Sequence, residues 1–179
     1  CEKMSEIKQP FMTALFTVSS HHPFVVPDKY KDSLKEEQLP IHKCIRYTDM
    51  AIGRFFETAR KQAWFKNTIF ILVSDHTNQS NHQQYKTDIG EFSAPFILYD
   101  PSGEIKPGMR AGIAQQIDIM PTIFGILGYN KPYFSFGCDL LNTPPQQTYA
   151  LNYINGVYQY TKNGYTMQFD GNRVIGIYS

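Results

Sequence analysis

Thr68-Ile-Phe-Ile-Leu-Val-Ser-Asp-His-Thr77 is an apolar, β-branched run that ends in an adjacent carboxylate and imidazole. Its composition and length predict a buried strand, which suits a parallel sheet covered on both faces. Ligands of open α/β sheets bind beyond the carboxyl ends of the strands, so we seek the function at Asp75 and His76. A carboxylate oxygen and an imidazole nitrogen can share one divalent cation if the backbone turns both side chains the same way. The alternative is that Asp75 caps a turn and His76 is an ordinary surface residue.

A further strand and the longest helix are predicted on the N-terminal side of this run. Residues 11–18, Phe-Met-Thr-Ala-Leu-Phe-Thr-Val, predict a strand that leads into a loop with His21 and His22. Residues 25–40 predict a surface excursion with at most a short helix, because prolines flank a centre rich in Lys and Glu. Apolar residues at helical spacing predict a helix from Ile41 to about Gln62. Strand, helical crossover and strand form the βαβ pattern, which is right-handed and parallel.

The alternation of strand and helix continues after the Asp-His pair. Ala94–Tyr99 predicts a third short strand. Ile117–Gly128 predicts a very apolar and therefore buried helix, with Asp118 as its cap, Pro121 in its first turn and Gly128 at its end. The predicted fold class is therefore α/β with a parallel sheet.

The last part of the chain changes character. Residues 148–179 alternate Tyr-rich and Val-rich runs with Asn155-Gly156, Asn163-Gly164 and Asp170-Gly171-Asn172. Asn-Gly between such runs is a strong hairpin signal. This segment predicts an antiparallel meander of about four strands.

Length, charge and cysteine usage exclude several classes of protein. The 179 residues carry a formal net charge of +1 without a run of like charge, so we predict no nucleic-acid partner. Three widely spaced cysteines argue against both a disulfide framework and a thiolate zinc site. No signal peptide and no apolar run long enough for a membrane span is visible, so the polypeptide as written is expected to be soluble. Because it begins at Cys1, we expect it to be a piece of a longer protein.

Four of the five histidines follow predicted strands or lie close behind them. His21 and His22 follow the first strand, His76 follows the central one, and His82 comes a few residues later. The carboxyl ends of parallel strands meet at one edge of a sheet, so we expect these side chains at one rim together with Asp75.

These pieces together resemble the alkaline phosphatase and sulfatase superfamily, and within it the phosphoglycerol transferases similar to lipoteichoic acid synthase. The matching segments, in family order, are Phe16-Thr-Val-Ser-Ser-His-His-Pro-Phe24, Ile45-Arg-Tyr-Thr-Asp-Met-Ala-Ile52, Phe70-Ile-Leu-Val-Ser-Asp-His-Thr77, Ala94-Pro-Phe-Ile-Leu-Tyr99, Gln116-Ile-Asp-Ile-Met-Pro-Thr-Ile123 and Phe136-Gly-Cys-Asp-Leu-Leu141. The resemblance implies an alkaline-phosphatase-like sandwich of which residues 11–147 form the C-terminal part of the catalytic domain. Residues 148–179 then form a small antiparallel β subdomain.

The resemblance also implies roles for individual residues. Asp75 and His76 correspond to two ligands of a single divalent metal, with Mn²⁺ as the first choice and Ca²⁺, Mg²⁺ or Zn²⁺ as alternatives. His21 corresponds to a catalytic histidine that touches the substrate phosphate or its leaving oxygen, and His22 is its neighbour if the register differs by one. His82 is similar in placement to a histidine that contacts phosphate or a second metal. The family's nucleophile has no counterpart in this chain.

The implied activity is that of a metal-dependent phosphoglycerol transferase, acting on a phospholipid or another phosphate or sulfate ester. The implied partner is a missing N-terminal half of the catalytic domain, without which we expect the fragment to be inactive. The full-length protein is expected at the extracytoplasmic face of a bacterial membrane. One alternative is a sulfatase with the same Asp-His pair. Another is a non-catalytic binding module whose Tyr-rich hairpins form the recognition surface.

Overall fold

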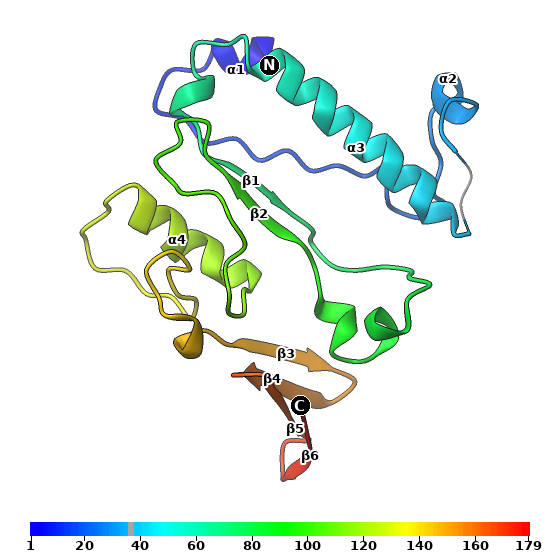
Figure 1. Cartoon of the computed structure of the whole chain (residues 1–179), viewed down its shortest axis with the longest axis vertical. Helices are drawn as coiled ribbons and strands as arrows, with labels where there is room; N and C mark the ends of the chain where they lie inside the picture. Colours follow the sequence, from blue (N-terminus) through cyan, green and yellow to red (C-terminus); the bar gives the residue numbers. More distant parts are fainter. Residues whose placement is uncertain (36–37) are drawn as a thin grey trace. The chain divides into compact units, whose positions relative to one another are not determined.

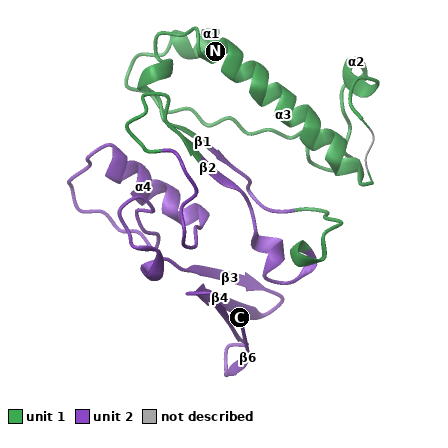
Figure 2. Cartoon of the chain, viewed as in Figure 1, with its two compact units in different colours: residues 1–71, 78–85, 98–106 green, residues 72–77, 86–97, 107–179 purple. Residues whose placement is uncertain are grey.

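The computed structural model describes residues 1–35 and 38–179, which form two compact units (Figure 2). Unit 1 comprises Cys1–Ile71, Asn78–Tyr85 and Leu98–Lys106, and unit 2 comprises Leu72–Thr77, Lys86–Ile97 and Pro107–Ser179. The predicted surface excursion over residues 25–40 includes residues 36–37, which lie outside the described residues.

Unit 1 is dominated by the long helix α3, Pro40–Ala59, which confirms the predicted helix (Figure 1). Proline at its first position suits a helix start, where the missing N–H is not needed. Ile41, Cys44 and Ala59 are its buried residues. The short helix expected in the surface excursion is α2, Asp28–Lys31. The unit also contains α1, Glu2–Ser5, the 3₁₀ turn η1, Phe65–Asn67, and all but the last residue of the 3₁₀ turn η2, Gln83–Lys86.

An aromatic cluster forms the core of unit 1. Trp64 and Phe65 are buried beside Ala59. Phe70 packs edge-on against Phe56, with ring centroids 5.1 Å apart, and stacks on Tyr99 at 6.0 Å. Such aromatic pairs add to the free energy gained by burying the rings. The cluster therefore fixes the start of the strand that leads to Asp75.

That strand, β1, Phe70–Val73, pairs with β2, Phe96–Tyr99, in a two-stranded sheet. Both predicted strands are confirmed, but most of β1 is only half-buried. Its first residue stacks on the last residue of β2, whereas Ser74 N–H donates to Pro95 O at 3.4 Å. This order of contacts is that of an antiparallel pair, so the predicted parallel sheet is not confirmed. Residues 74–95 contain the 3₁₀ turns η2 and η3, Gly90–Phe92, and not the long helix of a parallel crossover.

The strand predicted over residues 11–18 is wrong. This segment has no strand assignment and is drawn as a thin coil in Figure 1. Phe11 is half-buried and packs edge-on against Trp64, but the apolar side chains that follow are open to solvent, with Met12 93% and Phe16 75% exposed. A strand requires a neighbour to complete its hydrogen-bond ladder, and none of β1 to β6, the strands of the described residues, pairs with it. The βαβ unit inferred from it is therefore absent from the described residues.

Unit 2 contains the second predicted helix, α4, Ile119–Ile126, directly after the 3₁₀ turn η4, Gln116–Asp118. Pro121 and Thr122 are buried, but Met120 and Leu127 are exposed, so the helix is less buried than its sequence predicts. Its end follows the prediction, because Gly128 adopts φ 63°. Gly128 N–H donates to Gly125 O and Tyr129 N–H to Phe124 O, which is the Schellman arrangement.

The predicted meander is confirmed as a four-stranded antiparallel sheet in the order β3-β4-β5-β6. Its strands are β3, Ala150–Ile154, β4, Val157–Lys162, β5, Tyr165–Phe169, and β6, Val174–Tyr178. Asn155-Gly156 and Asn163-Gly164 have positive φ throughout, as two-residue hairpin turns require. Unit 2 also contains η5, Pro145–Gln147, before β3. The boundary between domains at residues 147 and 148 stays a prediction.

The meander has an unusual distribution of polarity. Gln159 and Thr166 are buried on one face, and both amide atoms of Gln159 lack a hydrogen-bond partner there. The opposite face carries a shallow apolar pocket of about 320 Å³. Its lining residues are Leu151, Tyr158, Tyr160, Met167 and Phe169.

None of the helices in residues 1–35 and 38–179 combines the length and the apolar character that crossing a bilayer requires.

Candidate functional site

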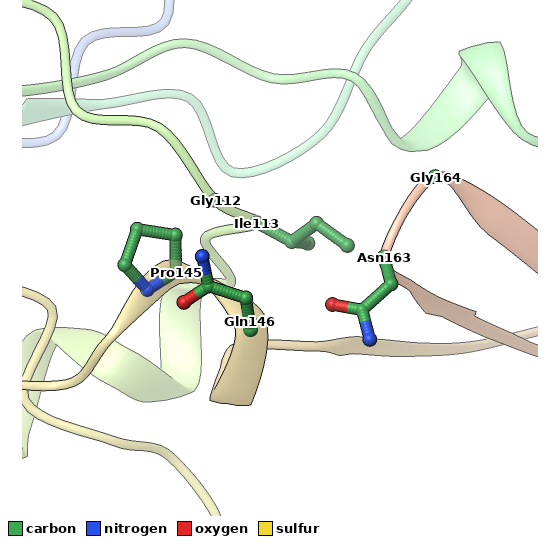
Figure 3. Close-up of a pocket in the computed structure, with 6 residues that line it drawn as sticks. All are labelled: Gly112, Ile113, Pro145, Gln146, Asn163 and Gly164. Atoms are coloured by element: carbon green, nitrogen blue, oxygen red, sulfur yellow. The ribbon is translucent and has the colours of Figure 1, made fainter.

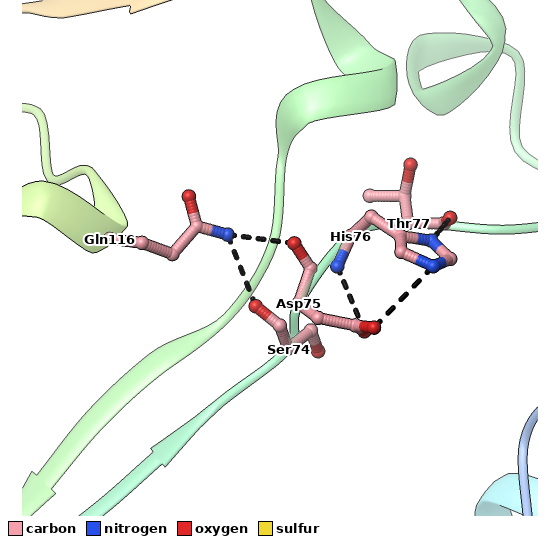
Figure 4. Close-up of polar contacts among 5 residues, drawn as sticks. All are labelled: Ser74, Asp75, His76, Thr77 and Gln116. Atoms are coloured by element: carbon pink, nitrogen blue, oxygen red, sulfur yellow. Dashed lines mark hydrogen bonds and ion pairs between the residues drawn. The ribbon is translucent and has the colours of Figure 1, made fainter. Parts of the chain in front are cut away.

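Asp75 and His76 lie two and three residues after the end of β1, in the loop that the sequence predicted (Figure 4). The N–H of His76 donates to Oδ1 of Asp75 at 3.0 Å. Nε2 of His76 lies 3.5 Å from Oδ2 of Asp75, so the carboxylate and the imidazole point the same way. The two side chains are 57% and 66% exposed, respectively, which leaves the space beside them open to a ligand.

The other ring nitrogen of His76 sets the tautomer of the neutral imidazole. Nδ1 lies 2.6 Å from the carbonyl oxygen of Thr77, and because a carbonyl can only accept, Nδ1 carries the hydrogen. In the neutral ring Nε2 therefore holds the lone pair. That lone pair faces a carboxylate oxygen, so the arrangement favours a cation shared by His76 and Asp75.

A glutamine that the sequence did not identify as a site residue contacts this loop. The side-chain amide of Gln116 donates to Ser74 O at 3.2 Å and to Asp75 O at 3.0 Å (Figure 4). In the sequence, Gln116 stood two positions before a predicted helix cap and began one of the segments that carry the family resemblance. Nothing in that pattern indicates a contact with a loop 41 residues earlier in the chain.

Gln116 begins the turn η4, whose backbone is held by buried hydrogen bonds. Asp118 is 1% exposed, and its carboxylate accepts the N–H groups of Gln115 and Cys138, each at 2.8 Å. The side chain of Gln115 in turn accepts the N–H of Leu151 in β3 at 2.8 Å. Asp118 directly precedes α4, as predicted, but its carboxylate stabilises η4 and the Cys138 segment and does not cap α4.

The loop after His76 is tied to η3. The hydroxyl of Thr77 donates to the carbonyl oxygen of Glu91 in a short hydrogen bond. Together with the Gln116 contacts, this bond holds the segment that contains Asp75 and His76 on both sides.

His21 and His22 lie in an exposed turn of unit 1. Nδ1 of His21 lies 2.8 Å from the carbonyl oxygen of His22, so Nδ1 again carries the hydrogen and Nε2 is the acceptor. The ring of His22 instead packs edge-on against Phe24, with centroids 5.7 Å apart. Phe24 adopts φ 61°, a left-handed conformation that costs a non-glycine residue roughly 1–2 kcal/mol. Such strain is frequent at functional sites.

His82 also belongs to unit 1 and is exposed. Its N–H donates to Ser80 Oγ at 3.1 Å, and its ring lies edge-on to Tyr85 at 6.3 Å. Of the predicted site residues, the structure brings Asp75 and His76 into contact. Placement of His21, His22 and His82 at the same rim stays a prediction.

The donor set at Asp75 and His76 suits a divalent metal of borderline hardness. One carboxylate oxygen and one imidazole nitrogen converge, and the second ring nitrogen is engaged by a carbonyl, as in established histidine sites. Across residues 1–35 and 38–179, no group of three or more His, Cys, Asp or Glu side chains is arranged to hold a metal ion. The pair of Asp75 and His76 is by itself smaller than a complete coordination shell.

A separate pocket of about 290 Å³ lies in unit 2 (Figure 3). Gly112, Ile113, Pro145, Gln146, Asn163 and Gly164 line it. Two amide side chains are its only polar side chains, and it contains no titratable group. It therefore lacks the chemistry for metal binding or proton transfer, and none of its residues was predicted as a site residue.

The sequence of this chain is similar to sequences of known proteins. The sulfatase family profile matches residues 2–129. Lipoteichoic acid synthase-like YvgJ of Bacillus subtilis is 26% identical over 185 residues, and the match covers 90% of this chain and 30% of that protein. The lipoteichoic acid synthase of Staphylococcus aureus is also 26% identical over 185 residues, covering 89% of this chain and 29% of that protein. The chain thus spans less than a third of the length of these relatives.

Solved structures give the same fold. A protein of the alkaline phosphatase superfamily from Vibrio parahaemolyticus matches with a TM-score of 0.80 and 24% identity, over 97% of this chain and 42% of that one. The lipoteichoic acid synthase LtaP of Listeria monocytogenes matches with a TM-score of 0.69 and 24% identity, over 87% of this chain and 43% of that one. The alkaline-phosphatase-like part of the fold prediction is therefore confirmed.

Proposed function

We propose, since this chain belongs to the sulfatase family, that it forms part of a divalent-metal-dependent phosphoglycerol transferase. The observation that carries the proposal is the convergence of Asp75 Oδ2 and His76 Nε2 at 3.5 Å beyond the end of β1. Similarity to lipoteichoic acid synthases favours transfer of a phosphorus-containing head group over hydrolysis of a sulfate ester.

In this proposal Asp75 and His76 hold the metal. Mn²⁺ is our first choice because the resemblance to phosphoglycerol transferases implies it, and Ca²⁺, Mg²⁺ or Zn²⁺ are the alternatives; the pair of a hard oxygen and a borderline nitrogen suits a divalent cation. A divalent cation at this point supplies charge neutralisation for the phosphate oxygens and a lower pKa for an attacking hydroxyl. The hydrogen bond from Nδ1 to Thr77 keeps the Nε2 lone pair of His76 available.

His21 is proposed as the phosphate contact and acid-base group. When a hydroxyl nucleophile from another part of the whole protein displaces the glyceride oxygen from phosphorus, one P–O bond forms and one breaks, the nucleophile gives up its proton and the leaving oxygen takes one up. An acceptor hydroxyl then displaces that nucleophile from phosphorus in the same way. A histidine is suited to deliver the proton near neutral pH. His21 would do so from Nε2 after that atom has taken up a proton, since Nδ1 already donates to His22 O. His22 and His82 are proposed as additional contacts to the substrate.

The remaining parts of the active site would come from elsewhere in the whole protein. We nominate no nucleophile among these 179 residues, and we propose that the chain needs a further part of the catalytic domain for turnover. A phospholipid donor would place that domain at the extracytoplasmic face of a bacterial membrane.

The test uses the whole protein that carries this sequence and phosphatidylglycerol labelled in its glycerol head group. We expect Mn²⁺-dependent release of diacylglycerol with the label transferred to an acceptor hydroxyl. Asp75→Asn should lower this rate by more than about 100-fold. Asp88→Asn changes an exposed carboxylate farther along the same connection between β1 and β2; it is the matched control and should keep the rate. An unchanged rate in Asp75→Asn contradicts the metal assignment, and hydrolysis of an aryl sulfate without transfer favours a sulfatase.

A further inference from the structure

The side-chain amide of Gln116 donates to two consecutive backbone carbonyls, Ser74 O at 3.2 Å and Asp75 O at 3.0 Å. Its two amide hydrogens match two acceptors, and the pairing leaves no choice of orientation, because carbonyl oxygens accept only from the NH₂ group. Figure 4 shows the amide reaching from η4 to the two carbonyls. One side chain thus bridges two consecutive peptide groups.

The position from which Gln116 reaches is well fixed. Its neighbours Gln115 and Asp118 form a reciprocal capping box across η4. Asp118 is buried and also accepts the N–H of Cys138. Gln116 can hold the loop only as firmly as η4 holds Gln116. The hydrogen bonds that support η4 are charge-assisted, because the buried carboxylate of Asp118 accepts them.

Toward β1, the other backbone hydrogen bonding of the segment that Gln116 holds is weak. β1 ends at Val73, and the backbone bond from Ser74 to Pro95 is long, at 3.4 Å. The direction of the Asp75 side chain depends on the peptide planes on either side of its Cα atom. Fixing Ser74 O and Asp75 O therefore fixes the direction of the Cα–Cβ bond from which the carboxylate extends.

The geometry points to Gln116 as a positioning residue for the Asp75–His76 pair. Its amide holds the peptide groups on both sides of Asp75, so that Oδ2 and the Nε2 atom of His76 meet on one side of the loop. This inference rests on the proposed function, because it concerns the metal affinity of that same pair. Residues that orient metal ligands typically contribute 10- to 100-fold to affinity.

The decisive variant is Gln116→Met in the whole protein. Methionine keeps the length of the side chain and adds no charge, but it removes both donors. Gln147→Met, an exposed glutamine in the 3₁₀ turn η5, is the matched control. The dissociation constant for Mn²⁺ is measured from the electron paramagnetic resonance signal of free Mn²⁺, and amide hydrogen exchange is followed over residues 74–77 without metal.

We expect Gln116→Met to weaken Mn²⁺ binding by about tenfold and to speed exchange over residues 74–77. The thermal midpoint and the control should stay unchanged, which separates positioning from general loss of structure. Mn²⁺ binding that Asp75→Asn abolishes but Gln116→Met leaves unchanged overturns this inference and leaves the proposed function standing. Absence of Mn²⁺ binding in the unsubstituted protein contradicts both.

Discussion

Nε2 of His76 lies 3.5 Å from Oδ2 of Asp75, while the other ring nitrogen of His76 is engaged by the carbonyl of Thr77. In the neutral imidazole, the lone pair of His76 Nε2 and the Oδ2 atom of Asp75 therefore face the same position. The His76→Ala variant removes the nitrogen but leaves the loop hydrogen bond of Thr77 to Glu91. We expect the electron-spin-echo modulation of an imidazole nitrogen to vanish from bound Mn²⁺ in the whole protein. His82→Ala should retain the modulation, and its loss there would move the ligand assignment to His82.

His21 and His22 differ in what their rings do. His21 has its Nδ1 atom on a carbonyl and its Nε2 atom free to act, whereas His22 packs on Phe24. His21→Ala should therefore lower kcat of the whole protein by roughly 10²- to 10⁴-fold, the usual range for an acid-base group. His22→Ala should change it by less than about tenfold. If His22→Ala lowers kcat more than His21→Ala does, the acid-base role belongs to His22.

Gly137 and Gly53 should respond oppositely to alanine. A Cβ atom at Gly137 would lie 2.2 Å from Ile117 O and 2.8 Å from Asp118 N, both of them backbone atoms of or beside η4. Gly137→Ala should therefore destabilise the chain by roughly 1–3 kcal/mol, because backbone must move. Gly53 lies inside α3 with open space around its Cβ position, so Gly53→Ala should stabilise by about 0.5–1 kcal/mol. Urea denaturation measures the free energy of unfolding of both variants. Equal changes in the two variants would contradict the prediction.

Asp118 should be important for stability, although it lies far along the sequence from the predicted metal ligands Asp75 and His76. It is buried and accepts two backbone N–H groups. Asp118→Ala leaves both donors without their partner, which should cost roughly 2–4 kcal/mol. Asp88→Ala, at an exposed position, should stay within about 0.5 kcal/mol. A small effect of Asp118→Ala in urea denaturation would show that water replaces the carboxylate.

The pH dependence of stability should include a contribution from Asp100. Its carboxylate accepts the Ser102 hydroxyl at 2.6 Å and the Ile105 N–H at 2.9 Å, and these bonds hold the pKa of Asp100 below its ordinary value of 3.8. Because the folded pKa is the lower one, the contribution is present above about pH 4 and is lost as pH falls through the folded value. Asp100→Asn should flatten the fall in stability below about pH 4. Denaturation midpoints at several pH values test this, and an unchanged slope would contradict it.

Local sequence signals predicted much of the fold. Apolar spacing identified α3, the Asn155-Gly156 and Asn163-Gly164 pairs identified the hairpins, and Gly128 marked the end of α4. Each of these signals acts within a few residues, where propensity and turn conformation decide the structure. The boundary of β1 before Asp75 followed from the same kind of pattern.

Signals that depend on distant partners were less informative. Residues 11–18 have the composition of a strand, but strand formation needs a neighbour that composition does not reveal. The direction of β2 relative to β1 was likewise not encoded in either strand. Gln116 was missed because its partners are carbonyl groups, which every residue possesses, so no residue pattern marks the contact. Asp75 and His76, in contrast, could be nominated from the sequence because a carboxylate and an imidazole are themselves the groups that the predicted chemistry requires.

The meander at the end of the chain pairs each strand with the next one along the sequence. Two of its connections have two residues, so the chain entropy lost on closing those loops is small. Sheets of such low contact order fold fast compared with sheets assembled from distant segments. Residues 150–178 can therefore reach their register by successive hairpin steps. In a refolding experiment we expect their amides to gain protection before those of β1 and β2, whose pairing must wait for closure of the much longer loop over residues 74–95.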